Sequence, residues 1–197
     1  MRLILPILIC GALVMWMAAG FAMLESGLVR AKNTTEILTK NVALYAVSCI
    51  MYLICGYMIM YGGELFLSGI ADVDADAVLG DFAEREDGFR GGSIYAGASD
   101  FFFQVVFVAT AMSIVSGAVA ERMKLWSFFM FAVVLTGLIY PVQGFWNWGG
   151  GFLTEIFGYF DFAGSGTVHL CGAAAALAGV LVLGPRKGKY GPNGQIN

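Results

Sequence analysis

The chain has few charged side chains and long runs that contain none. Asp, Glu, Lys and Arg make up only 13% of its 197 residues. Five runs lack all four residue types: Leu3–Leu24, Asn41–Gly63, Phe101–Ala120, Leu125–Thr154 and Phe162–Pro185. A helix crosses the ~30 Å hydrocarbon core of a bilayer in about 20 residues. The scarcity of charge therefore excludes a soluble globular protein and predicts an all-α polytopic membrane protein with five transmembrane helices.

Net charge and cysteine content exclude further classes of protein. The formal net charge is −3, which argues against nucleic acid as a partner. The four cysteines lie in the uncharged runs without metal-ligand spacing, and we expect them to be apolar packing residues: Cys10, Cys49, Cys55 and Cys171. The sequence predicts no metal ion, no cofactor and no enzymatic activity.

The longest polar segment, about residues 64–100, carries nine acidic and two basic residues. Its carboxylates alternate at Asp72, Asp74 and Asp76, as in a calcium-binding loop. Alanine, however, stands at the sixth and twelfth places, where such a loop needs glycine and glutamate. We therefore interpret the segment as a solvated acidic loop that concentrates cations near it.

The basic residues indicate how the chain crosses the membrane. Eight of the eleven fall on one side of the predicted spans: Arg30, Lys32, Lys40, Arg122, Lys124, Arg186, Lys187 and Lys189. Cytoplasmic loops carry an excess of Lys and Arg. The sequence thus predicts a multi-pass protein of the inner or plasma membrane with its N-terminus outside and residue 197 inside.

The first run has an alternative interpretation as a signal peptide. Arg2 precedes it, and small residues at Ala18, Ala19 and Gly20 lie near its end. The uncharged run has 22 residues, longer than the usual apolar region of a signal peptide, and four more spans follow. We favour a first transmembrane helix, and a cleaved signal remains the alternative.

Local signals predict where helices begin and bend. Asn33 and Glu36 have capping-box spacing and predict the start of the second helix. Pro141 predicts a kink in the fourth, and Trp146–Gly151 a turn on the external side. Asp161 is a strong N-cap type and predicts the start of the fifth helix, whose glycines and alanines suit close packing.

Three residues on these elements are candidates for chemistry. His169 is the only histidine and lies well inside the fifth run, where an ionisable group is costly. The alternative is a core histidine bonded to a backbone carbonyl. Phe107 shares a helix face with Phe103 and Gln104, where it blocks a channel or merely packs. The indole of Trp148 either holds a cation or anchors the chain at the interface.

Four segments resemble one family in the right order. Ala19–Asn33 (AGFAMLESGLVRAKN) closely resembles the first-helix signature of ammonium transporters, the Amt/Mep/Rh family. Ser116–Met123 is similar to the end of that family's third helix, and Trp148–Gly151 and Asp161–His169 resemble its later signatures. The resemblance covers essentially the whole chain and is weakest in the acidic loop.

The resemblance implies a function and a role for each candidate. It implies a homotrimer in which each subunit conducts ammonium or ammonia through its own hydrophobic pore, with a cytoplasmic PII-type regulator as a further partner. Trp148 would form one wall of an outer recruitment site, and Phe107 part of a phenylalanine gate beneath it. Asp161 would order that site, and His169 would be the first of two pore histidines.

The chain departs from the family in length. Members have about twice as many spans, so residues 1–197 are expected to form the N-terminal five-helix half of an ammonium transporter domain. An odd number of spans requires a tandem copy to insert in the opposite orientation, as in inverted-repeat transporters. The alternatives are an ammonium sensor of the same fold and an unrelated neutral-solute channel, for which the chain lacks Asn-Pro-Ala motifs.

Overall fold

The computed structural model of the chain describes residues 4–62, 65–67, 97–192 and 194–196. Five of its segments are long and apolar enough to cross a membrane, which confirms the predicted polytopic fold: Leu5–Leu28, Ala31–Tyr61, Gly97–Val119, Leu125–Glu155 and Ser165–Leu183. The described residues contain no strand. The Asp72–Asp76 pattern and most of the acidic loop lie outside the described residues.

The five spans are built from helices of several kinds. The α-helices are α1 (Ile4–Leu28), α2 (Thr34–Met51), α3 (Tyr57–Tyr61), α5 (Gly97–Val119), α6 (Leu125–Val134), α7 (Tyr140–Asn147), α8 (Phe152–Glu155) and α9 (Cys171–Leu183). The 3₁₀ turns are η1 (Ala31–Asn33) and η3 (Leu65–Leu67). The π-turns are η2 (Tyr52–Gly56), η4 (Leu135–Ile139) and η5 (Ser165–Leu170).

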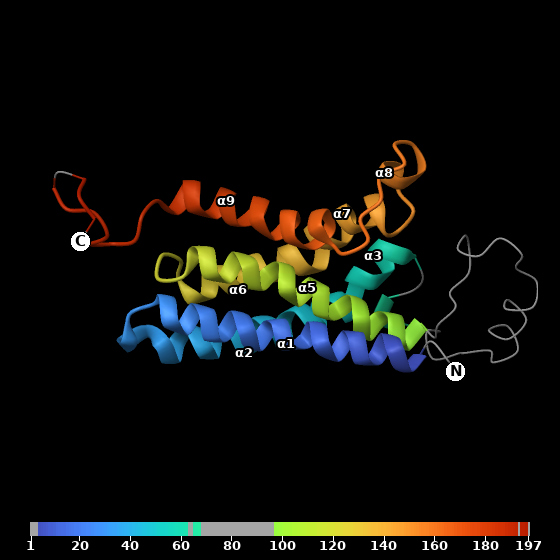
Figure 1. The fold of residues 1–197 in the computed structure, drawn as a ribbon, viewed down its shortest axis with the longest axis horizontal. Helices are drawn as coiled ribbons and strands as arrows, with labels where there is room; N and C mark the ends of the chain where they lie inside the picture. Colours follow the sequence, from blue (N-terminus) through green and yellow to red (C-terminus); the bar gives the residue numbers. More distant parts are fainter. Residues whose placement is uncertain (1–3, 63–64, 68–96, 193, 197) are drawn as a thin grey trace, which may run out of the picture.

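Successive spans run in opposite directions along an elongated bundle (Figure 1). Helices α1, α5 and α9 run one way, and α2–α3 and α6–α7 run the other. The loops that follow α1 and α5 therefore share one end of the bundle, which we call the Glu121 end. The turn that follows α7 and the segment before η5 share the opposite end, which we call the Trp148 end.

Helix α5 is the centre of the bundle, with 61% of its most apolar window buried. Two of its buried hydroxyls are satisfied by its own backbone: Thr110 donates to the Val106 carbonyl and Ser113 to the Ala109 carbonyl, both at 2.9 Å. Small residues then let α9 approach closely, because a Cβ built on Gly172 would lie 2.7 Å from the Ala111 carbonyl oxygen. The predicted close-packing surface of the fifth helix is thus present at Gly172, although Ala173 beside it is exposed.

The fourth span contains a π-turn just before Pro141. A proline lacks an N–H and its ring crowds the carbonyl four residues earlier, here that of Gly137. That carbonyl accepts a hydrogen bond from the Cys55 thiol at 3.3 Å instead. The turn η4 accommodates the missing hydrogen bond, and α7 continues to Asn147, so the turn predicted at Trp146–Gly151 begins only at Trp148. All four cysteines are free thiols; three of them are partly buried, whereas Cys10 is exposed, contrary to the packing role expected of it.

The capping box predicted at the start of α2 does not form. The helix does begin at Thr34 with Asn33 at its N-cap position, but Asn33 makes no capping hydrogen bond. Its side-chain amide donates to Glu121 Oε1 instead. The start of the helix was therefore predicted correctly, and the reason given for it was wrong, because a carboxylate 88 residues away competes for the same side chain.

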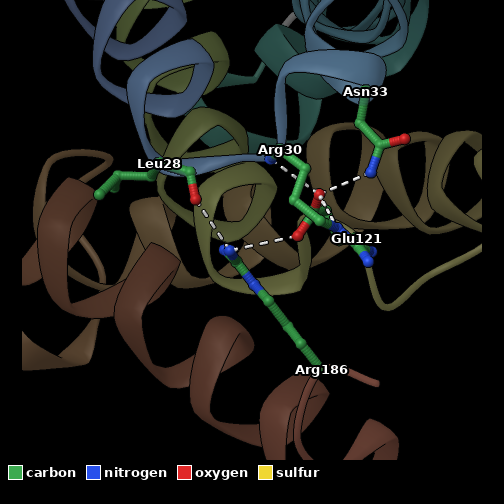
Figure 2. Close-up of polar contacts among 5 residues, drawn as sticks. All are labelled: Leu28, Arg30, Asn33, Glu121 and Arg186. Atoms are coloured by element: carbon green, nitrogen blue, oxygen red, sulfur yellow. Dashed lines mark hydrogen bonds and ion pairs between the residues drawn. The ribbon is translucent and has the colours of Figure 1, made fainter. Parts of the chain in front are cut away.

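Glu121 ties together three chain segments at its end of the bundle (Figure 2). One carboxylate oxygen accepts from the backbone N–H and the Nε of Arg30, at 3.0 and 3.1 Å. The other faces Arg186, which also donates to the Leu28 carbonyl at 2.9 Å. Burial alone raises the pKa of Glu121, but the hydrogen bonds from Arg30 and Asn33 outweigh it and bring the pKa to about 2.

A second, more deeply buried ion pair lies between the helices. Lys40 Nζ is 3.2 Å from Glu25 Oε2, and both side chains are less than a tenth exposed. Ser116 donates to the same Glu25 oxygen at 2.9 Å, and Lys40 also donates to the Ser116 carbonyl at 3.1 Å. Since buried charges are tolerated in a membrane when they are paired, this cluster joins α1, α2 and α5.

Candidate functional site

Trp148, Phe107 and Asp161 come from three separate segments and meet at the Trp148 end. The rings of Trp148 and Phe107 lie edge to face, with centroids 5.7 Å apart and an interplanar angle of 64°. Phe103, one turn earlier on α5, packs on Phe107 with centroids 5.0 Å apart. The indole Nε1 of Trp148 donates to the backbone carbonyl of Asp161 at 2.7 Å. Three of the four predicted site residues are therefore neighbours.

A glycine lets the indole sit against the start of the fifth span. Gly164 has φ +82°, a left-handed conformation that favours glycine. A Cβ at this position would lie 3.2 Å from the Trp148 ring and 2.8 Å from a methyl of Val168. Both the turn and the close approach therefore require glycine, and together they fix one side of the indole.

The carboxylate of Asp161 caps the fifth span. Its Oδ1 accepts from the backbone N–H groups of Gly164 and Ser165 at 3.0 and 2.9 Å. Its Oδ2 accepts from those of Gly166 and Thr167 at 2.9 and 2.7 Å. The helical turn begins at Ser165, so the predicted start at Asp161 was four residues early. The side chain reaches across the intervening turn and satisfies donors that a helix start leaves unpaired.

Hydrogen bonding keeps Asp161 ionised and occupied. Burial raises its pKa, but the hydrogen bonds from Thr167, Gly166 and Ser165 outweigh burial and hold the pKa below its usual value. An ionised carboxylate offers about four lone pairs, and the four backbone N–H groups take them up. Asp161 therefore orders the turn and has no acceptor left for a direct ligand.

Sequence reasoning missed a chain of polar side chains behind this cap. Asn147 on α7 donates from Nδ2 to the Thr167 hydroxyl oxygen at 3.2 Å. The Thr154 hydroxyl lies 2.7 Å from the backbone carbonyl oxygen of Asn147 and 3.0 Å from its Oδ1, and it donates to Asn147. One turn before Asn147, Gln143 donates to the Thr167 carbonyl at 2.7 Å. The available signal was two amides four residues apart in an apolar span, which share one helix face.

His169 lies apart from the three clustered residues. It is the fifth residue of the π-turn η5, and its backbone N–H donates to the Gly164 carbonyl at 3.0 Å. Its side chain is exposed, and within the described residues no group hydrogen-bonds to the imidazole. The interpretation as a core histidine bonded to a neighbouring carbonyl is therefore not realised in this structure.

An apolar groove of about 1080 Å³ runs between α6–α7 and α9. Thr167, Leu170 and Cys171 line it from one side, and Leu135 and Gln143 from the other. None of the four predicted site residues lines this groove. Thr167 and Leu170 of η5 thus line the groove, whereas His169 between them does not. Among the described residues no group of three or more His, Cys, Asp or Glu side chains is arranged to hold a metal ion.

Comparison with known proteins decides the family. A sequence model described as the Ammonium Transporter Family matches residues 5–197. The chain belongs to this family. Ammonium transporter Amt2 of Archaeoglobus fulgidus is 40% identical over 196 residues, which cover 95% of the chain and 39% of that protein. Ammonium transporter Amt1 of Haloferax mediterranei is 38% identical over 200 residues, or 96% of the chain and 36% of that protein.

A solved structure extends the family likeness to the fold. The structure of a protein named Sensor Amt Protein superimposes with a TM-score of 0.81 and 29% identity, over 98% of this chain and 47% of that one. The present chain spans about 40% of the length of the two curated relatives, Amt2 and Amt1. The predicted N-terminal, five-helix part of an ammonium transporter fold is confirmed, and the chain is a multi-pass membrane protein.

Proposed function

We propose that this chain supplies the recruitment site and the first part of the conduction path of an ammonium transporter. The observation that carries the proposal is the convergence of Trp148, Phe107 and Asp161 from three segments. The indole is held by its own N–H and by Gly164, so its ring is presented in a fixed position. A fixed, partly exposed indole attracts a cation by about 0.5–2 kcal/mol.

The proposed mechanism passes the neutral molecule rather than the ion. A charged group near the bilayer centre costs several kcal/mol, whereas neutral ammonia costs far less. Ammonium recruited at Trp148 transfers a proton to solvent water at that end, and ammonia passes Phe107 and then His169. Potassium has no proton to release and is rejected. Histidine suits the path because its imidazole donates, accepts and exchanges a proton near neutral pH.

Several features of the whole protein belong to the same proposal. The further spans of the longer relatives complete the path beside His169, which is exposed in this chain. We also propose a homotrimer with one path per subunit, a PII-type regulator on the cytoplasmic side, and an external N-terminus. The basic residues gathered at the Glu121 end, such as Arg30 and Arg186, support that orientation.

An ammonium sensor is the second candidate. The solved structure that covers 98% of this chain is of a protein named Sensor Amt Protein. A sensor would bind ammonium at the Trp148 end and pass the occupancy to a signalling partner, with little or no flux. Binding and transport therefore have to be measured separately.

Uptake by cells that lack ammonium transport tests the function. The full-length protein should restore growth on low ammonium, and His169→Ala should abolish rescue without reducing the amount of protein in the membrane. Residues 1–197 alone should not rescue. Rescue by this fragment, insensitive to His169→Ala, would contradict the proposal, and ammonium binding without flux would favour the sensor.

A further inference from the structure

The orientation of His169 depends on an irregular turn of the fifth span. Val168 and His169 both donate their backbone N–H to the Gly164 carbonyl, at 2.9 and 3.0 Å. The N–H of Cys171 donates to the carbonyls of Gly166 and Val168. It thus skips the Thr167 carbonyl, which would be its partner four residues back in an α-helix. A π-turn of this kind holds one residue more than an α-turn and is frequent at functional sites.

The skipped carbonyl is taken by a side chain from another helix. Gln143 Nε2 donates to the Thr167 carbonyl oxygen at 2.7 Å. The bond gives the Thr167 carbonyl a partner, so that this carbonyl does not need the α-helical bond from Cys171 to be satisfied. Gln143 lies next to Val142, which faces outward, and four residues before Asn147 on the same face of α7.

Asn147 contacts the side chain of Thr167, the residue whose carbonyl Gln143 bonds. Asn147 Nδ2 donates to the Thr167 hydroxyl oxygen at 3.2 Å, and the Thr154 hydroxyl donates to Asn147 in turn. Thr167 is therefore clamped at both its backbone and its side chain, two residues before His169.

We propose that Gln143 is a positioning residue that selects the π-turn and thereby sets the direction in which His169 projects. The inference rests on the proposed conduction role of His169. Relaxation of η5 to an α-helical register removes one residue from the turn, which rotates the residues it carries by as much as about 100°. His169 would then turn away from its present direction, while the Trp148 ring, held by Asp161 and Gly164, would stay in place.

The test uses Gln143→Met in the full-length protein, with Val142→Met as the matched control. Methionine keeps the length of glutamine but cannot donate to the Thr167 carbonyl. We expect the maximal uptake rate to fall roughly 10–100-fold, since small misplacements of a working group cost about that much. The half-saturating ammonium concentration, which depends on Trp148, should not change. Val142→Met should leave both values unchanged.

A cryo-EM structure of Gln143→Met gives the readout that does not depend on transport. We expect the Cys171 N–H to donate to the Thr167 carbonyl and the imidazole of His169 to be rotated. If the π-turn persists, or if it relaxes and the maximal rate is unchanged, the positioning role is wrong. If Gln143→Met does not accumulate, Gln143→Glu tests the same point, because an ionised carboxylate also lacks a donor.

The outcomes also separate this inference from the proposed function. A relaxed turn with normal uptake, in a protein where His169→Ala abolishes uptake, overturns the role of Gln143 and leaves the conduction role of His169 intact. Normal uptake by His169→Ala overturns the proposed function, whichever register the turn adopts.

Discussion

Replacing Asp161 tests whether its charge, its geometry or both hold the Trp148 end together. The carboxylate accepts four backbone N–H groups, two on each oxygen, at 2.7–3.0 Å. Loss of a helix cap costs up to about 2 kcal/mol. Loss of a negative charge at a partly buried helix start costs up to about 2 kcal/mol more. We therefore expect Asp161→Ala to lower the free energy of unfolding by about 3–4 kcal/mol.

Because each carboxylate oxygen accepts two N–H groups, a specific loss of stability can be predicted for Asp161→Asn. The amide oxygen can still accept from Gly164 and Ser165, but the amide NH₂ then faces the N–H groups of Gly166 and Thr167. Asparagine is also a good N-cap residue, but at this position it should retain only part of the cap. We expect its stability to lie between those of the wild type and Asp161→Ala, and uptake to fall in the same order.

The assay is thermal unfolding of the full-length protein in detergent, followed by uptake in vesicles. Because hydrogen bonding lowers the pKa of Asp161 in the folded state, its contribution is complete above the unfolded value of about 3.9. The contribution is lost only as pH falls through the lower, folded value. The difference between wild type and Asp161→Ala should thus be constant near neutral pH. Wild-type stability and uptake in Asp161→Asn would refute the electrostatic part of this reasoning.

Three further predictions concern the aromatic site, the packing and the topology. Trp148→Leu should weaken apparent ammonium affinity by about 0.5–2 kcal/mol, and an unchanged concentration dependence of transport would reduce Trp148 to an interfacial anchor. Gly172→Ala should destabilise the protein by about 1–3 kcal/mol, because its Cβ would lie 2.7 Å from the Ala111 carbonyl oxygen. The matched control Gly20→Ala, whose Cβ meets nothing within 4 Å, should be neutral, and equal stability of the two variants would contradict the close approach. Reporter fusions placed after Lys32, Lys124 and Lys189 should all report a cytoplasmic location. An external location at any one of them would overturn the predicted orientation.

The spans were predictable because a bilayer imposes them on composition. Leu125–Thr154 was identified from its lack of charge, and the structure places a span at Leu125–Glu155. Local capping patterns predicted the hydrogen bonds less well, because a residue distant in the sequence can bond the same side chain. Asn33 has capping-box spacing, yet its amide bonds Glu121, which no local pattern links to it. Asp161 was identified as a cap, but the three-residue turn that its side chain bridges was not.

The π-turns could not be predicted, and they matter most for the site. In η5 the Thr167 carbonyl bonds Gln143 of another helix and not Cys171, and this tertiary contact is not visible in the local sequence. No helical propensity or hydrophobic period distinguishes the two. The direction of His169 therefore had to come from the structure, although its presence in the fifth span was evident from the sequence.

Glu121 and Asp161, one at each end of the bundle, indicate how a cation would be held at the proposed recruitment site. Glu121 and Asp161 both have their oxygens occupied by donors of the same chain. At the proposed recruitment site the nearby charge thus acts through space, and the Trp148 ring makes the contact. A ring contributes about 0.5–2 kcal/mol, whereas a direct ion pair at low dielectric is several-fold stronger. A carboxylate with a free oxygen would retain the ammonium ion, and one committed to the backbone attracts it while leaving it able to move on.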